Sequence, residues 1–266
     1  MAPESQIAFV AIATIVGLVT GSFLNVCIYR IPRDVSIVFP RSFCVECGKQ
    51  ISWYDNVPLL SYALLHGRCR FCRKPIELRY PIVELMTAVV FIAIAIRYGW
   101  SVAALKWAVF EATLIVLFWT DLEERILPDE LTLGGFAAGL IFAAFVPVYG
   151  AFGDLFFPGM GSIGRSFLNA GVAVIFLAGL IWLMAILYAR VRRREGLGFG
   201  DVKLLALLAV FLGLEKGIAA VLIGAVAGSV IGGGYILLAH KKASTYELPF
   251  GSFLCAGAAI VPLLSS

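Results

Sequence analysis

The sequence predicts an all-α, polytopic membrane protein with a small cysteine-rich insertion near its N-terminus. Apolar residues make up 61% of the 266 positions, far above the roughly 45–50% that is usual in soluble domains. Apolar runs close to the roughly 20 residues that a helix needs to cross a bilayer recur along the chain. Two Cys-x-x-Cys pairs stand in the polar stretch that follows the first run.

We predict eight transmembrane helices. The apolar runs lie at 7–29, 82–98, 101–120, 131–148, 166–190, 202–214, 217–239 and 250–264. The first run has neither a charged start nor a small-residue cleavage site, so we interpret it as a retained span and not as a signal peptide. The predicted organisation is a first transmembrane helix at 1–29, a cytoplasmic insertion at 30–81 and a transmembrane core at 82–266.

The basic residues predict the orientation, because short cytoplasmic loops carry the excess of Lys and Arg. Segment 30–81 holds nine of the 21 basic residues. Others follow the third, fifth and seventh runs, at Arg125, Arg190, Arg192, Arg193, Arg194, Lys241 and Lys242. The loops of the opposite side hold only Arg97, Lys106, Arg165 and Lys216. We therefore expect the N-terminus outside and the insertion in the cytoplasm.

Two aspartates are the candidate catalytic residues. Asp121 closes the third run, and Asp201 follows Gly198-Phe199-Gly200 at the start of the sixth. The predicted topology puts both at the cytoplasmic face, where neighbouring carboxylates would resist double ionisation and supply an acid and a base together. Such a pair is typical of aspartic proteolysis. A plainer alternative stays open: Asp201 is a helix N-cap and Asp121 marks the membrane boundary.

Two further charged residues belong to this core. Lys203 lies two positions after Asp201, so the two do not face each other on a helix and we expect Lys203 to anchor the helix at the interface. Glu111 falls inside the third span, where an acid is by default a functional candidate, although a structural protonated role is equally compatible with the sequence. A proton-coupled transporter that uses intramembrane carboxylates, or a non-catalytic assembly subunit, therefore remains an alternative.

The insertion predicts a structural zinc site. Its ligands would be Cys44, Cys47, Cys69 and Cys72. Cytoplasmic thiols stay reduced, and four thiolates in two short pairs suit tetrahedral Zn²⁺ with no position open for catalysis. A redox dithiol is the alternative, but it normally uses one pair in a βαβ setting. Cys27 and Cys255 fall in apolar runs and are expected to pack.

Several segments, in order, resemble the bacterial type IV prepilin peptidases, membrane aspartic proteases of the GxGD class. They are Gly21-Ser22-Phe23-Leu24-Asn25-Val26, both cysteine pairs around Trp53-Tyr54-Asp55-Asn56-Val57-Pro58, Asp121-Leu122-Glu123, Ile126-Leu127-Pro128-Asp129, Gly198-Phe199-Gly200-Asp201-Val202-Lys203 and Pro249-Phe250-Gly251. Two small departures are Val45 and Ser252, where the family often has proline. We expect neither to touch a catalytic or metal-binding residue.

The resemblance implies a function. Such enzymes cleave the short basic leader from prepilins and type II secretion pseudopilins at the cytoplasmic face of the bacterial inner membrane, and many also methylate the new N-terminus with S-adenosylmethionine. Asp121 and Asp201 would be catalytic, with Gly198, Gly200 and Lys203 supporting the motif. The cysteine-bearing insertion favours the bifunctional form by analogy. The binding residues of the methyl donor and the oligomeric state stay unknown, and no nucleic-acid partner is expected.

Overall fold

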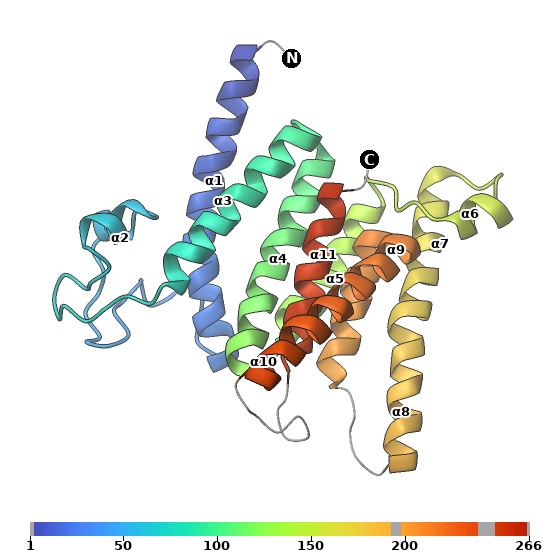
Figure 1. The fold of residues 1–266 in the computed structure, drawn as a ribbon. Helices are drawn as coiled ribbons and strands as arrows, with labels where there is room; N and C mark the ends of the chain where they lie inside the picture. The colour runs from blue at the N-terminus through green and yellow to red at the C-terminus, as the bar shows by residue number, and fades with distance from the viewer. Residues whose placement is uncertain (1–2, 193–197, 239–247, 265–266) are drawn as a thin grey trace. The chain divides into compact units, whose positions relative to one another are not determined.

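The computed structural model describes residues 3–192, 198–238 and 248–264, and these ranges form helices and connecting loops without a β-sheet (Figure 1). Two isolated β-bridges, Phe43 with Gln50 and Arg68 with Pro75, are the strand-like pairings among the described residues. The all-α prediction is therefore confirmed for this part of the chain. The predicted basic loop residues Arg193, Arg194, Lys241 and Lys242 lie outside the described residues.

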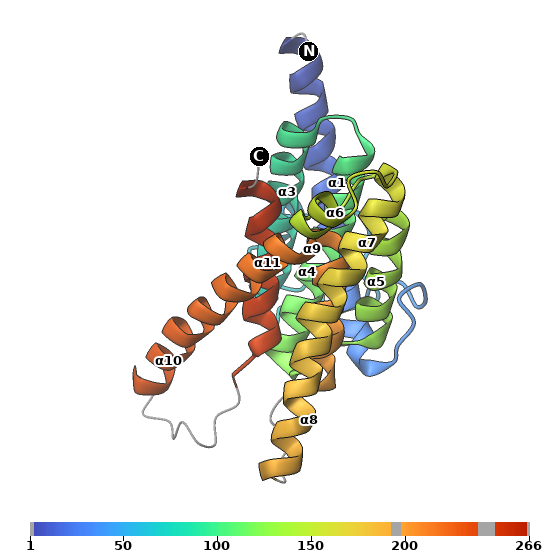
Figure 2. The ribbon, with the colours of Figure 1, turned by 90° about the vertical axis from the view of Figure 1, so that its right-hand side faces the viewer.

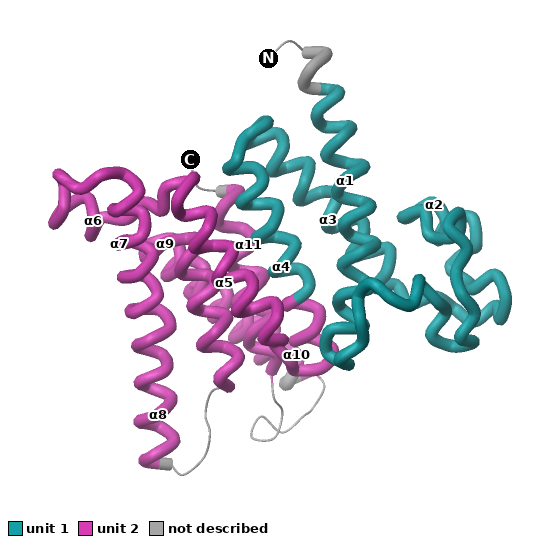
Figure 3. Tube along the Cα trace, turned by 180° about the vertical axis from the view of Figure 1, so that it is seen from behind, with its two compact units in different colours: residues 1–116 teal, residues 117–266 magenta. Residues whose placement is uncertain are grey.

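The chain divides into two compact units, residues 1–116 and 117–266 (Figure 3). The boundary falls inside one helix, α4 (Val102–Glu124). The first unit contains the cysteine-rich insertion, and the second contains both candidate aspartates. Each unit is described by itself.

In the first unit, two long helices pack closely along each other. Its elements before α4 are α1 (Pro3–Arg30), η1 (Ile31–Arg33), η2 (Trp53–Asn56), α2 (Leu60–Leu64) and α3 (Arg79–Tyr98). A Cβ placed on Gly21 of α1 would lie 2.7 Å from the Cα of Glu84 on α3, so the two backbones touch here. Small residues allow such close approach between transmembrane helices. This contact fixes how Ser22, the next residue, and Asn25, one turn further along α1, face α3.

In the second unit, one long apolar helix packs against three others. The elements after α4 are α5 (Asp129–Ala143), α6 (Ala151–Phe156), α7 (Ser162–Val174), the π-helical η3 (Ile175–Gly179), α8 (Leu180–Arg192), α9 (Phe199–Ala227), the π-helical η4 (Gly228–Gly232), α10 (Gly233–Leu238) and α11 (Phe250–Leu264). Helix α9 contacts α5, α7 and α11. Its residues Leu204, Leu205, Leu207 and Leu208 are buried, so α9 is the core of this unit.

Helix α9 changes direction at Gly213 (Figures 1 and 2). Gly213 has φ 77° and ψ −176°, in a region that residues with a Cβ avoid. A Cβ there would also lie 2.8 Å from the carbonyl oxygen of Tyr149. The sequence predicts two separate runs at 202–214 and 217–239, and the observed break lies at Gly213, just before the predicted gap at 215–216.

The predicted count of eight spans is not confirmed. Five helical stretches of the described chain are long and apolar enough to cross a membrane: Ile7–Arg33, Arg79–Tyr98, Val102–Glu124, Ser162–Val191 and Phe199–Tyr235. The last of these joins two predicted runs across Gly213. Helices α5 and α11, with 15 residues each, are shorter than the roughly 20 residues that a crossing helix needs.

Candidate active site and metal centre

Asp121 lies near the end of α4, where it is buried and held by α11. Its side chain is only 7% exposed. The backbone N–H of Ser252, on the first turn of α11, donates to Asp121 Oδ2 at 2.6 Å. The Ser252 hydroxyl lies 2.8 Å from the same oxygen and 2.9 Å from the Phe118 carbonyl oxygen, so its single hydrogen has two acceptors. Oδ2 is thus committed to α11, which leaves Oδ1 for other partners.

Asp201 lies on the first turn of α9 and not at its N-cap. The helix begins at Phe199 with Gly198 as the capping residue, and the Asp201 N–H donates to the Gly198 carbonyl at 3.1 Å. The alternative that Asp201 serves as the helix N-cap is therefore wrong. Its carboxyl group is half-buried and near enough to Asp121 for a direct coulombic interaction between the two. The fold thus brings together two acids that are 80 positions apart in sequence.

Leu127, in the loop between α4 and α5, packs against the glycines beside both aspartates. A Cβ on Gly200 would lie 3.3 Å from Leu127 Cβ. A Cβ on Gly251 would lie 3.1 Å from Leu127 Cδ1 and 3.1 Å from Asp121 Cγ. Three separate sequence motifs therefore meet at one leucine side chain. A larger residue at Gly251 would press directly on the Asp121 carboxyl group.

Lys203 does not pair with Asp201. Its ammonium group lies 2.5 Å from Asp129 Oδ1 at the start of α5, and it also sits 4.9 Å from the centre of the Phe199 ring. These contacts tie the first turn of α9 to α5. This agrees with the expectation that Lys203 leaves Asp201 without a direct counter-ion. Glu111, in the first unit, is 1% exposed, and neither of its carboxyl oxygens has a hydrogen-bond partner among the described residues.

The four cysteines of the insertion form one cluster made of two matching turns. In the first turn the Cys44 N–H donates to the Lys49 carbonyl at 2.9 Å and the Gly48 N–H to the Cys44 carbonyl at 2.8 Å. In the second, the Cys69 N–H donates to the Lys74 carbonyl at 2.9 Å and the Arg73 N–H to the Cys69 carbonyl at 3.1 Å. In both turns the residue after the second cysteine has positive φ, 71° at Gly48 and 58° at Arg73.

The cluster fits a tetrahedral metal ion. The sulfur atoms of Cys44, Cys47, Cys69 and Cys72 all lie within 4.8 Å of one another. Cys44 Sγ and Cys72 Sγ are 3.9 Å apart, and tetrahedral Zn–S bonds of roughly 2.3 Å place two sulfurs about 3.8 Å apart. Backbone N–H groups of Cys72 and Phe71 donate to the Cys69 sulfur and outweigh its desolvation, lowering the pKa of that thiol to about 7. The donor set suits Zn²⁺.

Charged contacts brace the segment between the two cysteine pairs. Arg70 binds both carboxylate oxygens of Asp55 at 2.6 Å, and this hydrogen-bonded guanidinium lowers the pKa of Asp55. Lys74 pairs with Glu46 at 3.2 Å, which links the second turn to the first. The tryptophan-containing segment is thereby tied to the two cysteine turns.

Comparison with known proteins identifies the family. Residues 108–233 match the type IV leader peptidase family, and residues 15–98 match the bacterial peptidase A24 N-terminal domain. A prepilin leader peptidase/N-methyltransferase of Burkholderia pseudomallei (strain 1026b) is 36% identical over 96% of this chain and 84% of its own length. The chain belongs to the type IV leader peptidase family.

Other members of the type IV leader peptidase family are similar over much of the chain. A protein of the same name from Myxococcus xanthus is 39% identical over 84% of this chain, although the match spans only 62% of the Myxococcus protein. The Neisseria gonorrhoeae relative is 34% identical over 77% of this chain and 75% of its own length. No solved structure gives a significant match. Family membership and the apolar helices together make the chain a multi-pass protein of the inner membrane.

Ser252 contacts the candidate active site of this type IV leader peptidase, and the sequence analysis did not predict this contact. We expected Val45 and Ser252 to touch no catalytic or metal-binding residue, and for Ser252 this was wrong because it bonds directly to Asp121. A proline in its place would have neither an N–H nor a hydroxyl to donate. The signal available in the sequence was its position directly after Phe250-Gly251.

Replacing Ser252 by alanine should slow substrate cleavage by about 2- to 10-fold, because one net hydrogen bond contributes roughly 0.5–1.5 kcal/mol. The backbone N–H to Asp121 remains in this variant. Steady-state kinetics should place the effect on kcat. Ser229→Ala is the matched control, since the Ser229 hydroxyl donates only to the Ala225 carbonyl on its own helix. Equal kcat values for both variants would mean that the Ser252 hydroxyl serves Phe118 alone.

Proposed function

We propose that this protein removes the basic leader peptide from type IV prepilins and type II secretion pseudopilins by aspartic hydrolysis, and then methylates the new N-terminal amine. The observation that carries the proposal is the approach of Asp121 and Asp201 from distant parts of the sequence within one unit. The names of the relatives, prepilin leader peptidase/N-methyltransferase, support both activities. They do not favour the transporter or the assembly subunit.

The two carboxyl groups would share one proton in the resting enzyme. The ionised member takes a proton from water as the water oxygen bonds to the scissile carbonyl carbon, while the protonated member donates a hydrogen bond to the carbonyl oxygen. The C–N bond then breaks, and the leaving amine takes a proton from the dyad. Because Ser252 occupies Asp121 Oδ2, the water and Asp201 would meet Asp121 at Oδ1.

In the proposed orientation, the site would lie where such a substrate presents its cleavage point. A prepilin carries an apolar helix in the bilayer, so its leader junction falls at the inner membrane interface. The proposed orientation, with the N-terminus outside, puts Asp121, Asp201 and the cysteine insertion on the cytoplasmic side. The concentration of basic residues in 30–81 supports it. Whether each of the shorter helices crosses fully does not alter the proximity of the two acids.

Zn²⁺ and S-adenosylmethionine complete the proposal. Cys44, Cys47, Cys69 and Cys72 would hold zinc in a purely structural role, since four protein ligands leave no position for water or substrate. S-adenosylmethionine supplies the methyl group of the second reaction. By family resemblance we connect that reaction with the N-terminal unit, which carries the insertion.

The test is direct assay of the purified full chain in detergent. A type IV prepilin is incubated with and without S-adenosylmethionine, and the product masses are read. We expect loss of the leader in both samples and one added methyl group only with the donor. An intact prepilin, cut in parallel by an established prepilin peptidase, would overturn the cleavage proposal. A cleaved product without the added methyl group would overturn the second activity alone.

A further inference from the structure

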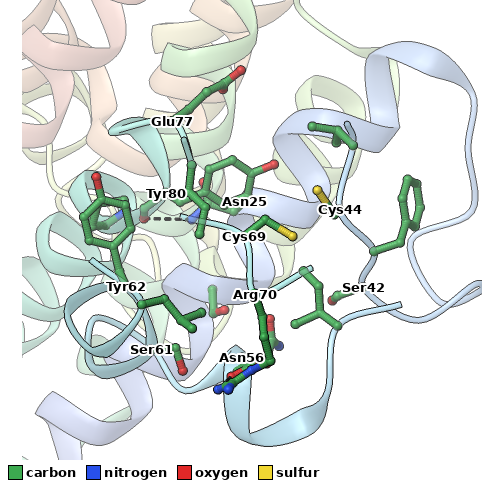
Figure 4. Close-up of a pocket in the computed structure, with 18 of the residues that line it drawn as sticks. Asn25, Ser42, Cys44, Asn56, Ser61, Tyr62, Cys69, Arg70, Glu77 and Tyr80 are labelled. Carbon is green, nitrogen blue, oxygen red and sulfur yellow. Dashed lines mark hydrogen bonds and ion pairs between the residues drawn. The ribbon is translucent and has the colours of Figure 1, made fainter. Parts of the chain in front are cut away.

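The first unit contains a cavity that the aspartic hydrolysis does not use. It has a volume of about 400 Å³ and lies between α1, the insertion and the start of α3 (Figure 4). Small-molecule sites typically measure roughly 300–1,000 Å³. Side chains of both cysteine turns, including Cys44 and Cys69, belong to its wall. The cavity is therefore large enough for a small organic ligand or the end of a peptide.

Asn25 of α1 brings an unsatisfied hydrogen-bond acceptor to this cavity. The side chain is 2% exposed and lines the cavity wall. Its Nδ2 donates to the Tyr80 carbonyl at 3.1 Å (Figure 4). It also donates to the Gly21 carbonyl at 3.3 Å. Exchanging the amide nitrogen and oxygen would set an oxygen against two carbonyls, so the orientation is well defined. Oδ1 has no partner among the described residues, and leaving such a buried acceptor without a hydrogen bond is unfavourable.

Glu84 lies one helical turn after Tyr80 and lines the same cavity. It is 8% exposed. Its hydrogen bonds come from neutral donors: the Leu59 N–H at 2.8 Å and the Ser22 hydroxyl. Within the described ranges no Lys or Arg forms an ion pair with it. Asn25 contacts Tyr80, and Ser22 contacts Glu84. These contacts lie on adjacent turns of the packed helices α1 and α3, which keeps Asn25 Oδ1 close to the Glu84 carboxyl group.

The cations of the cavity wall are already engaged by other groups. Arg70 is bound by Asp55 at 2.6 Å and Lys74 by Glu46 at 3.2 Å. Arg30 donates to the carbonyls of Ser36 and Pro40, each at 2.8 Å. Among the described residues, no cation of the cavity wall thus pairs with the Glu84 carboxyl group. A bound anion would meet this group unfavourably, whereas a bound cation would supply the missing ion pair.

Aromatic rings form part of the wall, beside aliphatic side chains. Tyr29, Phe43, Tyr62, Phe71 and Tyr80 line the cavity. Their faces attract organic cations and stack on planar groups. A wall with aromatic rings, a carboxylate and a free amide oxygen favours a ligand that has N–H donors and a positive charge.

We propose that this cavity binds an organic ammonium group, with Asn25 Oδ1 and the Glu84 carboxylate as its hydrogen-bond acceptors. The inference rests on the proposed N-methylation, because both reactants of that step carry such a group. One is the α-ammonium of S-adenosylmethionine, and the other is the freed N-terminal amine of the cleaved pilin. The chemistry recognised is the same for either source, and the experiment separates them.

The test measures ligand binding to the full-length protein in detergent by isothermal titration calorimetry. The probes are S-adenosylmethionine and a synthetic peptide with the mature pilin N-terminus. Glu84→Gln retains an oxygen for the Leu59 N–H but removes the charge. Loss of a charge-assisted hydrogen bond should weaken the recognised probe about 10- to 100-fold. The matched control is Asp34→Asn, because Asp34 is an exposed acid of the same unit that does not line the cavity, and it should change affinity less than about twofold.

Changes to the ligand provide a second arm that needs no protein variant. N-acetylation deletes the ammonium group of the peptide. Removal of the α-amino group from S-adenosylhomocysteine, the demethylated form of the donor, deletes the same group there. Each change should weaken binding to the wild-type protein as much as Glu84→Gln does. If these changes weaken binding of the methyl donor, the site is assigned to the donor. If they weaken binding of the peptide, the site is assigned to the acceptor amine. Unchanged binding of both probes, or no binding of either by protein that still cleaves prepilin, would overturn the inference and leave the peptidase proposal standing.

Discussion

Asp121→Asn and Asp201→Asn proteins should each leave a prepilin uncut under conditions in which the wild type cleaves it fully. Asparagine keeps the size and hydrogen bonding of aspartate but cannot exchange the shared proton. Positioned acid–base groups contribute roughly 10²–10⁴-fold to rate, so we expect initial cleavage rates to fall by at least about 10²-fold in both variants. Mass spectrometry of the product N-terminus over time gives the rates.

The control for the two aspartate variants is an acid of the same unit other than Asp121 and Asp201. Glu130 is an exposed carboxylate near the start of α5, and Glu130→Gln should retain most of the cleavage rate. Circular dichroism and gel filtration should match for all four proteins. A wild-type rate in either aspartate variant would exclude the shared-proton mechanism at this site.

The second large effect is expected at the cysteine cluster. Elemental analysis should find zinc in the wild type and a strong loss of it in Cys72→Ser. Structural zinc contributes roughly 10–16 kcal/mol of apparent binding free energy in small zinc-finger peptides. Loss of one ligand removes a large part of this binding free energy. The freed insertion should become sensitive to limited proteolysis between α1 and α3.

Cys27→Ala is the control for zinc binding. Cys27 is buried in α1 and lies outside the four-sulfur cluster. Its replacement should leave the zinc content at the wild-type level. Equal zinc in Cys72→Ser and wild type would exclude Cys72 as a ligand.

The sequence alone predicts the main parts of both sites. The all-helical fold, confirmed in the described ranges, follows from long apolar runs, and the cysteine cluster follows from two short pairs whose spacing permits one metal ion. The common membrane face from which we predict the approach of Asp121 to Asp201 stays a prediction. The fold and the cysteine cluster could be predicted because each depends on local spacing or on one global constraint, the bilayer.

What the sequence could not supply depends on contacts between distant segments. The hydrogen bond from Ser252 to Asp121 requires the register of α11 against α4, which no local pattern fixes. Leu127 meets Gly200 and Gly251 for the same reason. Hydropathy also does not give the number of crossings, because it depends on the count of apolar residues, whereas the backbone conformation of Gly213 determines where one long helix breaks.

The two cysteine turns have the same hydrogen bonds but different backbone strain. Gly48 adopts its positive φ freely, whereas Arg73 adopts it against the clash of its own Cβ, which costs about 1 kcal/mol. We expect the proposed zinc ion, bound to Cys69 and Cys72 of the second turn, to maintain that conformation. Removal of the ion by a chelator should therefore open the second turn before the first, so that release would start at the C-terminal pair and proceed toward Cys44.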